Sequence, residues 1–177
     1  MSRDRNVKLI VHQINRGLGG ALSTGFKHAI GDTIITLDSD LSHDASNITN
    51  FIKEMKNGYD VVIGSRYVGN GGMIGVPKWR VLVSKFAGFL FSILFNMFKI
   101  KDKTSGYRAY STLIKKIDIT STGFPAVLEI LVKMKKNDAR MKEIPIVLTW
   151  RKKGYSKFKI FSIMKAYLKT IFHLKLG

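Results

Sequence analysis

The chain has 177 residues, 45% of them hydrophobic, which is enough for one domain with a sizeable core. It contains no cysteine, which excludes disulfides, thiolate metal sites and a cysteine nucleophile. Its formal net charge of +18 predicts an anionic partner: a nucleic acid, an anionic membrane or a phosphorylated substrate.

Apolar runs and helical patterns alternate in the first third of the chain. We predict, in chain order, a strand at 7–11, a helix from the glycine-rich turn at 15–20 to about residue 30, a strand at 33–37, a helix from Ser46 or Asn47 to about Lys56, and a strand at 60–63. Gly58 ends the second of these helices. Such alternation favours an α/β three-layer sandwich with a mostly parallel sheet.

The middle of the chain combines a glycine-rich loop with an apolar helix. The loop at 64–77 is expected to be mobile and to lie at the surface. A helix is predicted at 79–100, and its uncharged core at 86–98 is too short to cross a bilayer. Two interpretations of this helix remain open: it is buried, or it lies in the membrane interface.

The last part of the chain is strongly basic. From Lys133 onward, 13 Lys or Arg residues accompany two acids. The segment at 160–176 has the apolar spacing of an amphipathic helix, for which packing on a core is the default. Its lack of acids and the basic loop before it favour a membrane-surface role. We therefore divide the chain into an α/β domain at 1–159 and an amphipathic membrane-surface helix at 160–177.

Two carboxylates, Asp38 and Asp40, follow the apolar run at 34–37. Open α/β folds bind ligands at the carboxyl ends of their strands, and two hard oxygen donors there suit a divalent cation that holds a diphosphate. The alternative interpretation is a helix N-cap plus a turn before the helix near Ser46.

Six short motifs occur in a fixed order along the chain. They are NRGLGGALSTGFKHAIGD at 15–32, LDSDLSH at 37–43, GYDVVIGSRYV at 58–68, KWRVLVSK at 78–85, DKTSGYRAY at 102–110 and RKKGYSKFK at 151–159. Together they resemble the family-2 glycosyltransferases, in particular the dolichol-phosphate mannosyltransferases and related polyprenyl-phosphate glycosyltransferases. The resemblance implies the A-type glycosyltransferase fold.

One departure from the family concerns the start of the fold. Members begin with a strand and an I-P-x-Y-N-E-type motif, followed by a D-D-x-S-type turn, and these elements hold the base and ribose of the sugar nucleotide. Nothing at 1–14 matches them. We therefore expect a fold that is truncated at its N-terminus.

The resemblance also implies a reaction. A sugar, with mannose from GDP-mannose expected, moves from a nucleotide diphosphate to dolichyl or polyprenyl phosphate with inversion, assisted by Mg²⁺ or Mn²⁺. The acceptor is already an anion and needs no general base. The expected location is the cytoplasmic face of a membrane, and the absence of a membrane span in the sequence leaves room for a transmembrane partner subunit.

The metal and phosphate roles are implied in the same way. Asp40 would coordinate the metal, Asp38 would bind the metal or a sugar hydroxyl, and Ser42 would contribute an oxygen or hold a water. His43 is interpreted as a structural hydrogen-bonding residue. Arg66 would bind phosphate, for which a guanidinium is suited, and the alternative is an ordinary surface arginine.

Further residues would bind the two substrates. The donor-side turn is Asn15, Arg16 and Gly17, for which a tight strand–helix connection is the alternative. The expected lipid-phosphate contacts are Arg80, Ser84, Arg151, Lys153, Ser156 and Lys157. Asp102, Ser105 and Gly106 resemble an acceptor-side loop, although a plain turn is an alternative. Glu129 would face the sugar or be partnered at the edge of the core.

Two rival functions stay open at this point. The first is an inactive or partial family member that binds lipid phosphate or sugar nucleotide without turnover. The second is a nucleic-acid-binding protein, which only the charge suggests. The acid cluster around Asp38 and the lack of a recognised binding motif speak against nucleic acid as a partner.

Overall fold

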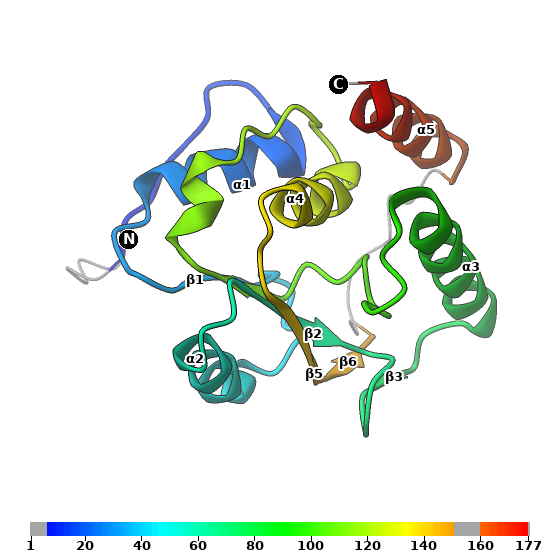
Figure 1. The fold of residues 1–177 in the computed structure, drawn as a ribbon, viewed down its shortest axis with the longest axis horizontal. Helices are drawn as coiled ribbons and strands as arrows, with labels where there is room; N and C mark the ends of the chain where they lie inside the picture. The colour runs from blue at the N-terminus through cyan, green and yellow to red at the C-terminus, as the bar shows by residue number, and fades with distance from the viewer. Residues whose placement is uncertain (1–6, 151–159, 177) are drawn as a thin grey trace.

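The computed structural model describes residues 7–150 and 160–176 and has the layers of an α/β sandwich (Figure 1). Its elements, in chain order, are α1 (Gly17–His28), β1 (Ile34–Thr36), the 3₁₀ turn η1 (Ala45–Asn47), α2 (Ile48–Lys56), β2 (Val61–Ser65), β3 (Gly72–Ile74), α3 (Lys78–Phe95), β4 (Arg108–Tyr110), the 3₁₀ turn η2 (Thr112–Lys116), α4 (Pro125–Lys136), β5 (Met141–Pro145), β6 (Val147–Thr149) and α5 (Ile160–Leu176).

The main sheet has four strands in the order β1-β4-β2-β5. Strand β2 pairs parallel with β5, while β4 pairs antiparallel with both β1 and β2. Strands β1, β2 and β5 therefore run in one direction, and β4 is inserted between two of them in the opposite direction. The predicted α/β class with mostly parallel strands is confirmed, although the sequence did not indicate the antiparallel insertion.

Strand β2 lies at the centre of the sheet and shows why the fold has three layers. Val61 and Ile63 pack into the core beneath α1 and α4, whereas Val62 packs into a second core with Phe51 of α2. Successive side chains of a strand point to opposite faces, so a strand that is apolar throughout requires cover on both sides. Figure 1 shows α1 and α4 on one side of the sheet and α2 on the other.

Helix α2 begins and ends where the sequence predicts. The Asp44 carboxylate accepts a hydrogen bond of 2.8 Å from the Ser46 N–H at the start of η1, which leads into the helix. Gly58 follows the helix with a φ of 82°, a conformation that glycine adopts without steric cost.

The segment at 7–11 is not a strand, so this prediction was wrong. It has no ladder partner among the described residues, and Val7, Leu9 and Val11 are 66 to 75% exposed. An apolar, β-branched run becomes a strand only when a neighbouring strand accepts its backbone hydrogen bonds. The glycine-rich loop also differs from the prediction, since β3 within it pairs parallel with β6.

Helix α3 is not a buried helix. Phe91 is 3% exposed and packs on Tyr167 of α5, with ring centroids 5.4 Å apart. Most other large apolar side chains of α3 face outward: Trp79, Leu82, Val83, Phe86, Phe89, Leu90 and Ile93. No helix in the described ranges combines the length and the apolar character that a membrane crossing requires.

Helix α5 confirms the predicted amphipathic helix at 160–176. Thr170 and Leu174 are buried and pack toward α4 and the main core, while Leu168 and Phe172 are more than 60% exposed. The helix therefore covers part of the core and also presents apolar side chains outward, beside α3 (Figure 1).

Candidate active site

Asp38 lies just beyond the carboxyl end of β1 and next to the β4 backbone. The Thr36 hydroxyl donates a 2.7 Å hydrogen bond to the Gly106 carbonyl, which ties the end of β1 to the residues before β4. A Cβ atom at Gly106 would lie 3.8 and 3.9 Å from the two carboxylate oxygens of Asp38. The Asp38 side chain is 55% exposed, so its carboxylate is accessible to a ligand.

Asp40 occupies a tight turn two residues later. Its Oδ1 accepts a 3.1 Å hydrogen bond from the Ser42 N–H, and the intervening Leu41 has a φ of 59°. Asp44 caps η1 and Asn47 is the N-cap of α2, so neither Asp38 nor Asp40 is a cap. The structure therefore supports a turn at Asp40 but not the alternative in which these two acids cap the next helix.

His43 lies between the acid pair and a second polar cluster. Its Nε2 is 3.8 Å from Asp38 Oδ2, and its ring packs on Tyr107 with centroids 5.1 Å apart. Burial lowers its pKa below the usual value; Asp38 opposes this change and Arg66 adds to it. The charges of Asp38, Asp40 and Arg66 therefore all act on this one imidazole.

Arg66 is not a surface arginine. It follows β2 directly, and its side chain is 12% exposed. Its Nε and Nη2 each donate a 2.7 Å hydrogen bond to the Asp102 carboxylate, and its backbone N–H donates a third of 3.0 Å. Burial raises the pKa of Asp102, but the hydrogen bonds and charge of Arg66 outweigh this and hold it below its usual value. Asp102 is therefore a permanent counter-ion for Arg66.

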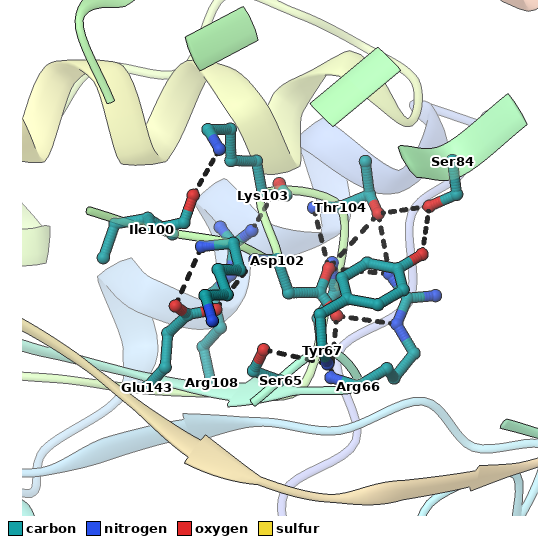
Figure 2. Close-up of polar contacts among 12 residues, drawn as sticks. Ser65, Arg66, Tyr67, Ser84, Ile100, Asp102, Lys103, Thr104, Arg108 and Glu143 are labelled. Atoms are coloured by element: carbon teal, nitrogen blue, oxygen red, sulfur yellow. Dashed lines mark hydrogen bonds and ion pairs between the residues drawn. The ribbon is translucent and has the colours of Figure 1, made fainter. Parts of the chain in front are cut away.

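Three hydroxyl groups extend this pair toward α3. Arg66 Nη2 donates to Thr104 Oγ1 over 2.7 Å, Thr104 Oγ1 lies 3.2 Å from Ser84 Oγ, and the Tyr67 hydroxyl donates to Ser84 over 3.0 Å. Figure 2 shows Tyr67, Ser84 and Thr104 gathered beside the Arg66–Asp102 pair. The structure thus brings together the predicted residues Arg66, Ser84 and Asp102, which come from three separate motifs.

The loop that carries Asp102 is held rigidly from two sides. Glu143 accepts hydrogen bonds of 2.8 and 2.7 Å from the backbone N–H groups of Lys101 and Asp102. Arg108 is fully buried and donates to the carbonyls of Lys103 and Val127. Sequence reasoning assigned no role to Glu143 or Arg108. A charged residue inside the apolar strand of β4 is a signal that could have identified Arg108.

The donor-side turn at the start of α1 is closed by contacts within the chain. Asn15 Oδ1 accepts from the Gly17 N–H over 2.8 Å, and the Gly19 N–H donates to the Thr122 carbonyl over 2.9 Å. A Cβ atom at Gly17 would lie 2.2 Å from that carbonyl oxygen, and Gly17 has a φ of 68°. These contacts support the tight-connection alternative, and the side chains of Asn15 and Arg16 remain exposed.

Glu129 has hydrogen-bonding partners at the edge of the core, which is one of the two interpretations given above. It accepts hydrogen bonds from Thr120, Ser121 and Lys133. Burial raises its pKa, but these donors outweigh burial and lower it to about 2. Glu129 therefore holds the segment on which the start of α1 packs.

Several predicted site residues lie partly or wholly outside the part of the chain that the structure describes. Arg80 is in α3, one turn before Ser84, but its side chain lies outside the described structure. The predicted lipid-phosphate residues Arg151, Lys153, Ser156 and Lys157 lie outside the described ranges. Within those ranges, no three His, Asp or Glu side chains gather into a metal cage. Asp38 and Asp40 would instead hold a cation together with substrate oxygens, which is the usual arrangement for Mg²⁺.

Comparison with known proteins identifies the family of the chain. Residues 1–114 match the family described as Glycosyl transferase family 2. The chain is 36% identical over 170 residues to a dolichol-phosphate mannosyltransferase of Pyrococcus furiosus, covering 95% of this chain and 47% of that protein. It is 30% identical over 163 residues to an undecaprenyl-phosphate mannosyltransferase of Micrococcus luteus, covering 88% of this chain and 66% of that protein. The chain thus spans about half to two thirds of the length of these relatives.

Solved structures share the fold at lower sequence identity. A glucosyl-3-phosphoglycerate synthase of Mycobacterium tuberculosis, crystallised with Mn²⁺, uridine diphosphate and glucosyl-3-phosphoglycerate, superposes with a TM-score of 0.64 at 16% identity. The superposition covers 89% of this chain and 55% of that one. The same enzyme with uridine diphosphate alone gives a TM-score of 0.63 over the same shares.

Proposed function

The chain belongs to glycosyltransferase family 2, and we propose that it transfers a sugar from a nucleotide diphosphate to the phosphate of a polyprenyl lipid. The observation that carries the proposal is the hydrogen-bonded link from Ser84 of α3, through Thr104, to the Arg66–Asp102 pair. It joins a helix with an exposed apolar face to the region where Arg66 and the acids Asp38 and Asp40 act on His43. A lipid-borne acceptor and a diphosphate donor need such an arrangement.

The donor side of the proposal rests on the acid pair. Asp38 is exposed and Asp40 is fixed in a turn, so both can offer carboxylate oxygens, and Ser42 would add an oxygen. Mg²⁺ or Mn²⁺, when bound there, would neutralise the leaving diphosphate. Arg16, just before α1, would also contact the donor. Mannose, GDP-mannose and inversion at the sugar are part of this proposal, by similarity to the mannosyltransferases.

The acceptor side rests on α3. Ser84 is held by Tyr67 and Thr104, and Arg80 lies one turn earlier on the same helix. These two residues would receive the lipid phosphate, with the basic residues Arg151, Lys153, Ser156 and Lys157 closing over it. Arg66 is held by Asp102, so its role is to place positive charge near the two phosphates without changing position. Orientation and charge neutralisation are the main catalytic requirements when the nucleophile is already an anion.

The same helices support the proposed location. The exposed apolar residues of α3, together with Leu168 and Phe172 of α5, would lie in the interface of a membrane at its cytoplasmic face. A transmembrane partner subunit would strengthen this attachment.

The test is direct. The chain is incubated with GDP-mannose, Mg²⁺ and a short polyprenyl phosphate, and the lipid-linked sugar is measured. We expect product with the unchanged chain and none with Asp40→Asn. Absence of product, under conditions in which a full-length relative turns over, would contradict activity of this chain.

A second candidate is a binding module without turnover. The unpaired apolar segment at 7–11 favours it, because this segment has no partner in the described structure. Calorimetry separates the two candidates: a module would bind polyprenyl phosphate through the Ser84 region but form no product when GDP-mannose is added.

A further inference from the structure

The segment at 120–122 lies where the first turns of α1 and α4 meet α5 (Figure 1). Its Thr122 carbonyl accepts the hydrogen bond from the Gly19 N–H of α1. Its Ser121 hydroxyl lies 2.9 Å from the Thr170 hydroxyl of α5. Glu129, in the second turn of α4, binds the same segment from within the core. The function proposed above uses the turn before α1 but assigns no role to this carboxylate.

Glu129 fixes the backbone of the segment. Its Oε1 accepts hydrogen bonds from the Thr120 N–H over 2.9 Å and from the Thr120 hydroxyl over 2.8 Å, and its Oε2 accepts from the Ser121 N–H over 2.8 Å. Lys133 donates a further hydrogen bond of 2.7 Å to Oε1 and also binds the Asp118 carbonyl. Hydrogen bonds from backbone N–H groups are directional, so two of them to one carboxylate hold the segment in one arrangement.

The carboxylate of Glu129 is fully buried and charged. Leu128 and Ile130, its neighbours in α4, are buried as well, so Glu129 lies in an otherwise apolar stretch. With a pKa of about 2, it remains ionised at neutral pH. A buried ion pair is often no more stabilising than apolar residues of the same volume. What a leucine at this position could not supply is the orientation of the two N–H groups.

The turn before α1 packs directly on the segment at 120–122. A Cβ atom at Gly19 would lie 1.7 Å from the Ser121 carbonyl oxygen, so the two backbones are in close contact. Arg16 is held on the other side, since a Cβ atom at Gly20 would lie 2.5 Å from the Arg16 Cβ. A displacement of the segment would therefore move the turn that carries Arg16.

We infer that Glu129 is a positioning residue for the sugar-nucleotide donor: it holds the segment at 120–122, and this segment holds the turn at 15–17. The inference rests on the proposed function, in which Arg16 contacts the donor. Glu129 itself would touch neither substrate. The acceptor-side residues Ser84 and Thr104 belong to a separate hydrogen-bonded cluster, so the effect of Glu129 should be confined to the donor.

The test measures the binding of GDP-mannose, with Mg²⁺ present, by calorimetry. Glu129→Gln replaces an oxygen that accepts hydrogen bonds with an NH₂ group that donates them, so one side of the segment loses its acceptor. We expect Kd for GDP-mannose to rise about tenfold, because a small displacement of a positioned group is costly. Kd for a short polyprenyl phosphate should stay the same. Equal weakening of both ligands, or an unchanged Kd for GDP-mannose, would overturn the inference.

Arg16→Gln tests whether the effect passes through the turn. In the unchanged chain this substitution should weaken binding of GDP-mannose. In the Glu129→Gln background it should change Kd by only about twofold or less, because Arg16 is already displaced there. Losses that multiply in the double variant would show that the two residues act independently, which would also overturn the inference.

Two further variants keep the test decisive if Glu129→Gln does not fold, which urea unfolding establishes. Lys133→Met removes one donor to the carboxylate and should raise Kd for GDP-mannose by a smaller factor. Thr170→Val is the matched control, because it separates Ser121 from α5 without changing a contact of Glu129, and it should leave Kd unchanged. A rise in Thr170→Val without one in Lys133→Met would assign the positioning role to α5 instead.

The same measurements separate this inference from the proposed function. If the unchanged chain binds no GDP-mannose, both are wrong. If it binds GDP-mannose but forms no lipid-linked sugar, the proposed transfer is wrong, and the comparison of the variants still decides the role of Glu129.

Discussion

Arg66 and Asp102 lie 36 positions apart in the sequence and form a bidentate ion pair with two hydrogen bonds of 2.7 Å. The Asp102 side chain is completely buried, and its carboxylate also accepts from the backbone N–H groups of Arg66, Thr104 and Ser105. This pair joins the end of β2 to the loop before β4, and through Thr104 it reaches α3.

Removal of one partner of this pair should destabilise the fold. Asp102→Asn leaves the guanidinium without its counter-ion, and we expect a loss of about 3–5 kcal/mol in the free energy of unfolding. Urea unfolding measures it. Glu54→Gln, which breaks the surface pair with Lys142, is the control and should leave the midpoint nearly unchanged. Similar effects of the two variants would show that the buried pair has no special structural role.

Glu129 should make stability depend on acid pH. Its pKa falls from 4.5 to about 2 on folding, so its contribution is complete above pH 4.5 and is lost as the pH falls toward 2. Glu129→Gln should be less stable than the unchanged chain at pH 7 and should lose less stability between pH 4.5 and 2. Thermal unfolding at several pH values checks this. Parallel pH curves for the two proteins would contradict the assignment.

Asp40→Asn should abolish sugar transfer without unfolding the chain. Loss of one carboxylate at a diphosphate site is expected to reduce turnover by about two orders of magnitude or more. Mn²⁺ binding, followed by electron paramagnetic resonance with GDP present, should weaken in parallel. Asp44→Asn is a suitable control, because asparagine also caps a helix and should preserve activity. Unchanged Mn²⁺ binding in Asp40→Asn would exclude this residue as a ligand.

Ser84→Ala should weaken binding of the acceptor and leave binding of the sugar nucleotide unchanged. One hydrogen bond to the lipid phosphate would be lost, so we expect KM for polyprenyl phosphate to rise about tenfold, while KM for the sugar nucleotide stays the same. Tyr67→Phe, which removes the hydroxyl that donates to Ser84, should give a smaller rise of the same kind. A change in the KM of the donor would instead place Ser84 on the nucleotide side.

The outward face of α3 should contribute to membrane binding and contribute little to the free energy of unfolding. Leu82→Ser and Phe86→Ser alter side chains that are 71% and 70% exposed, so each should change the free energy of unfolding by about 0.5 kcal/mol or less. Vesicle binding should nevertheless fall severalfold for each. Phe91→Ser is the opposite control: this side chain is 3% exposed, and its replacement should destabilise the fold strongly. Unchanged vesicle binding in the first two variants would contradict a membrane role for this face.

Local patterns in the sequence were sufficient for α2, for α5 and for the position of the acid pair, whereas α3 ends at Phe95, before the predicted residue 100. The ends of α2 follow from capping residues and glycine, and α5 follows from apolar spacing; these signals act over a few neighbouring residues. The position of Asp38 and Asp40 after an apolar strand is likewise a property of one continuous segment.

Long-range pairing decided the rest, because it depends on residues that are distant in the sequence. The segment at 7–11 has a strand pattern but no neighbouring strand in the part of the chain that the structure describes, whereas the three residues of β4 form a strand because β1 and β2 lie on either side of them. Arg66 could be identified as a phosphate-type arginine, but its buried partner Asp102, and the hydroxyl groups that connect the pair to Ser84, became visible only in the folded chain. The spacing of apolar residues predicts which face of a helix or strand is apolar. Which other element packs on that face is decided only by the tertiary structure.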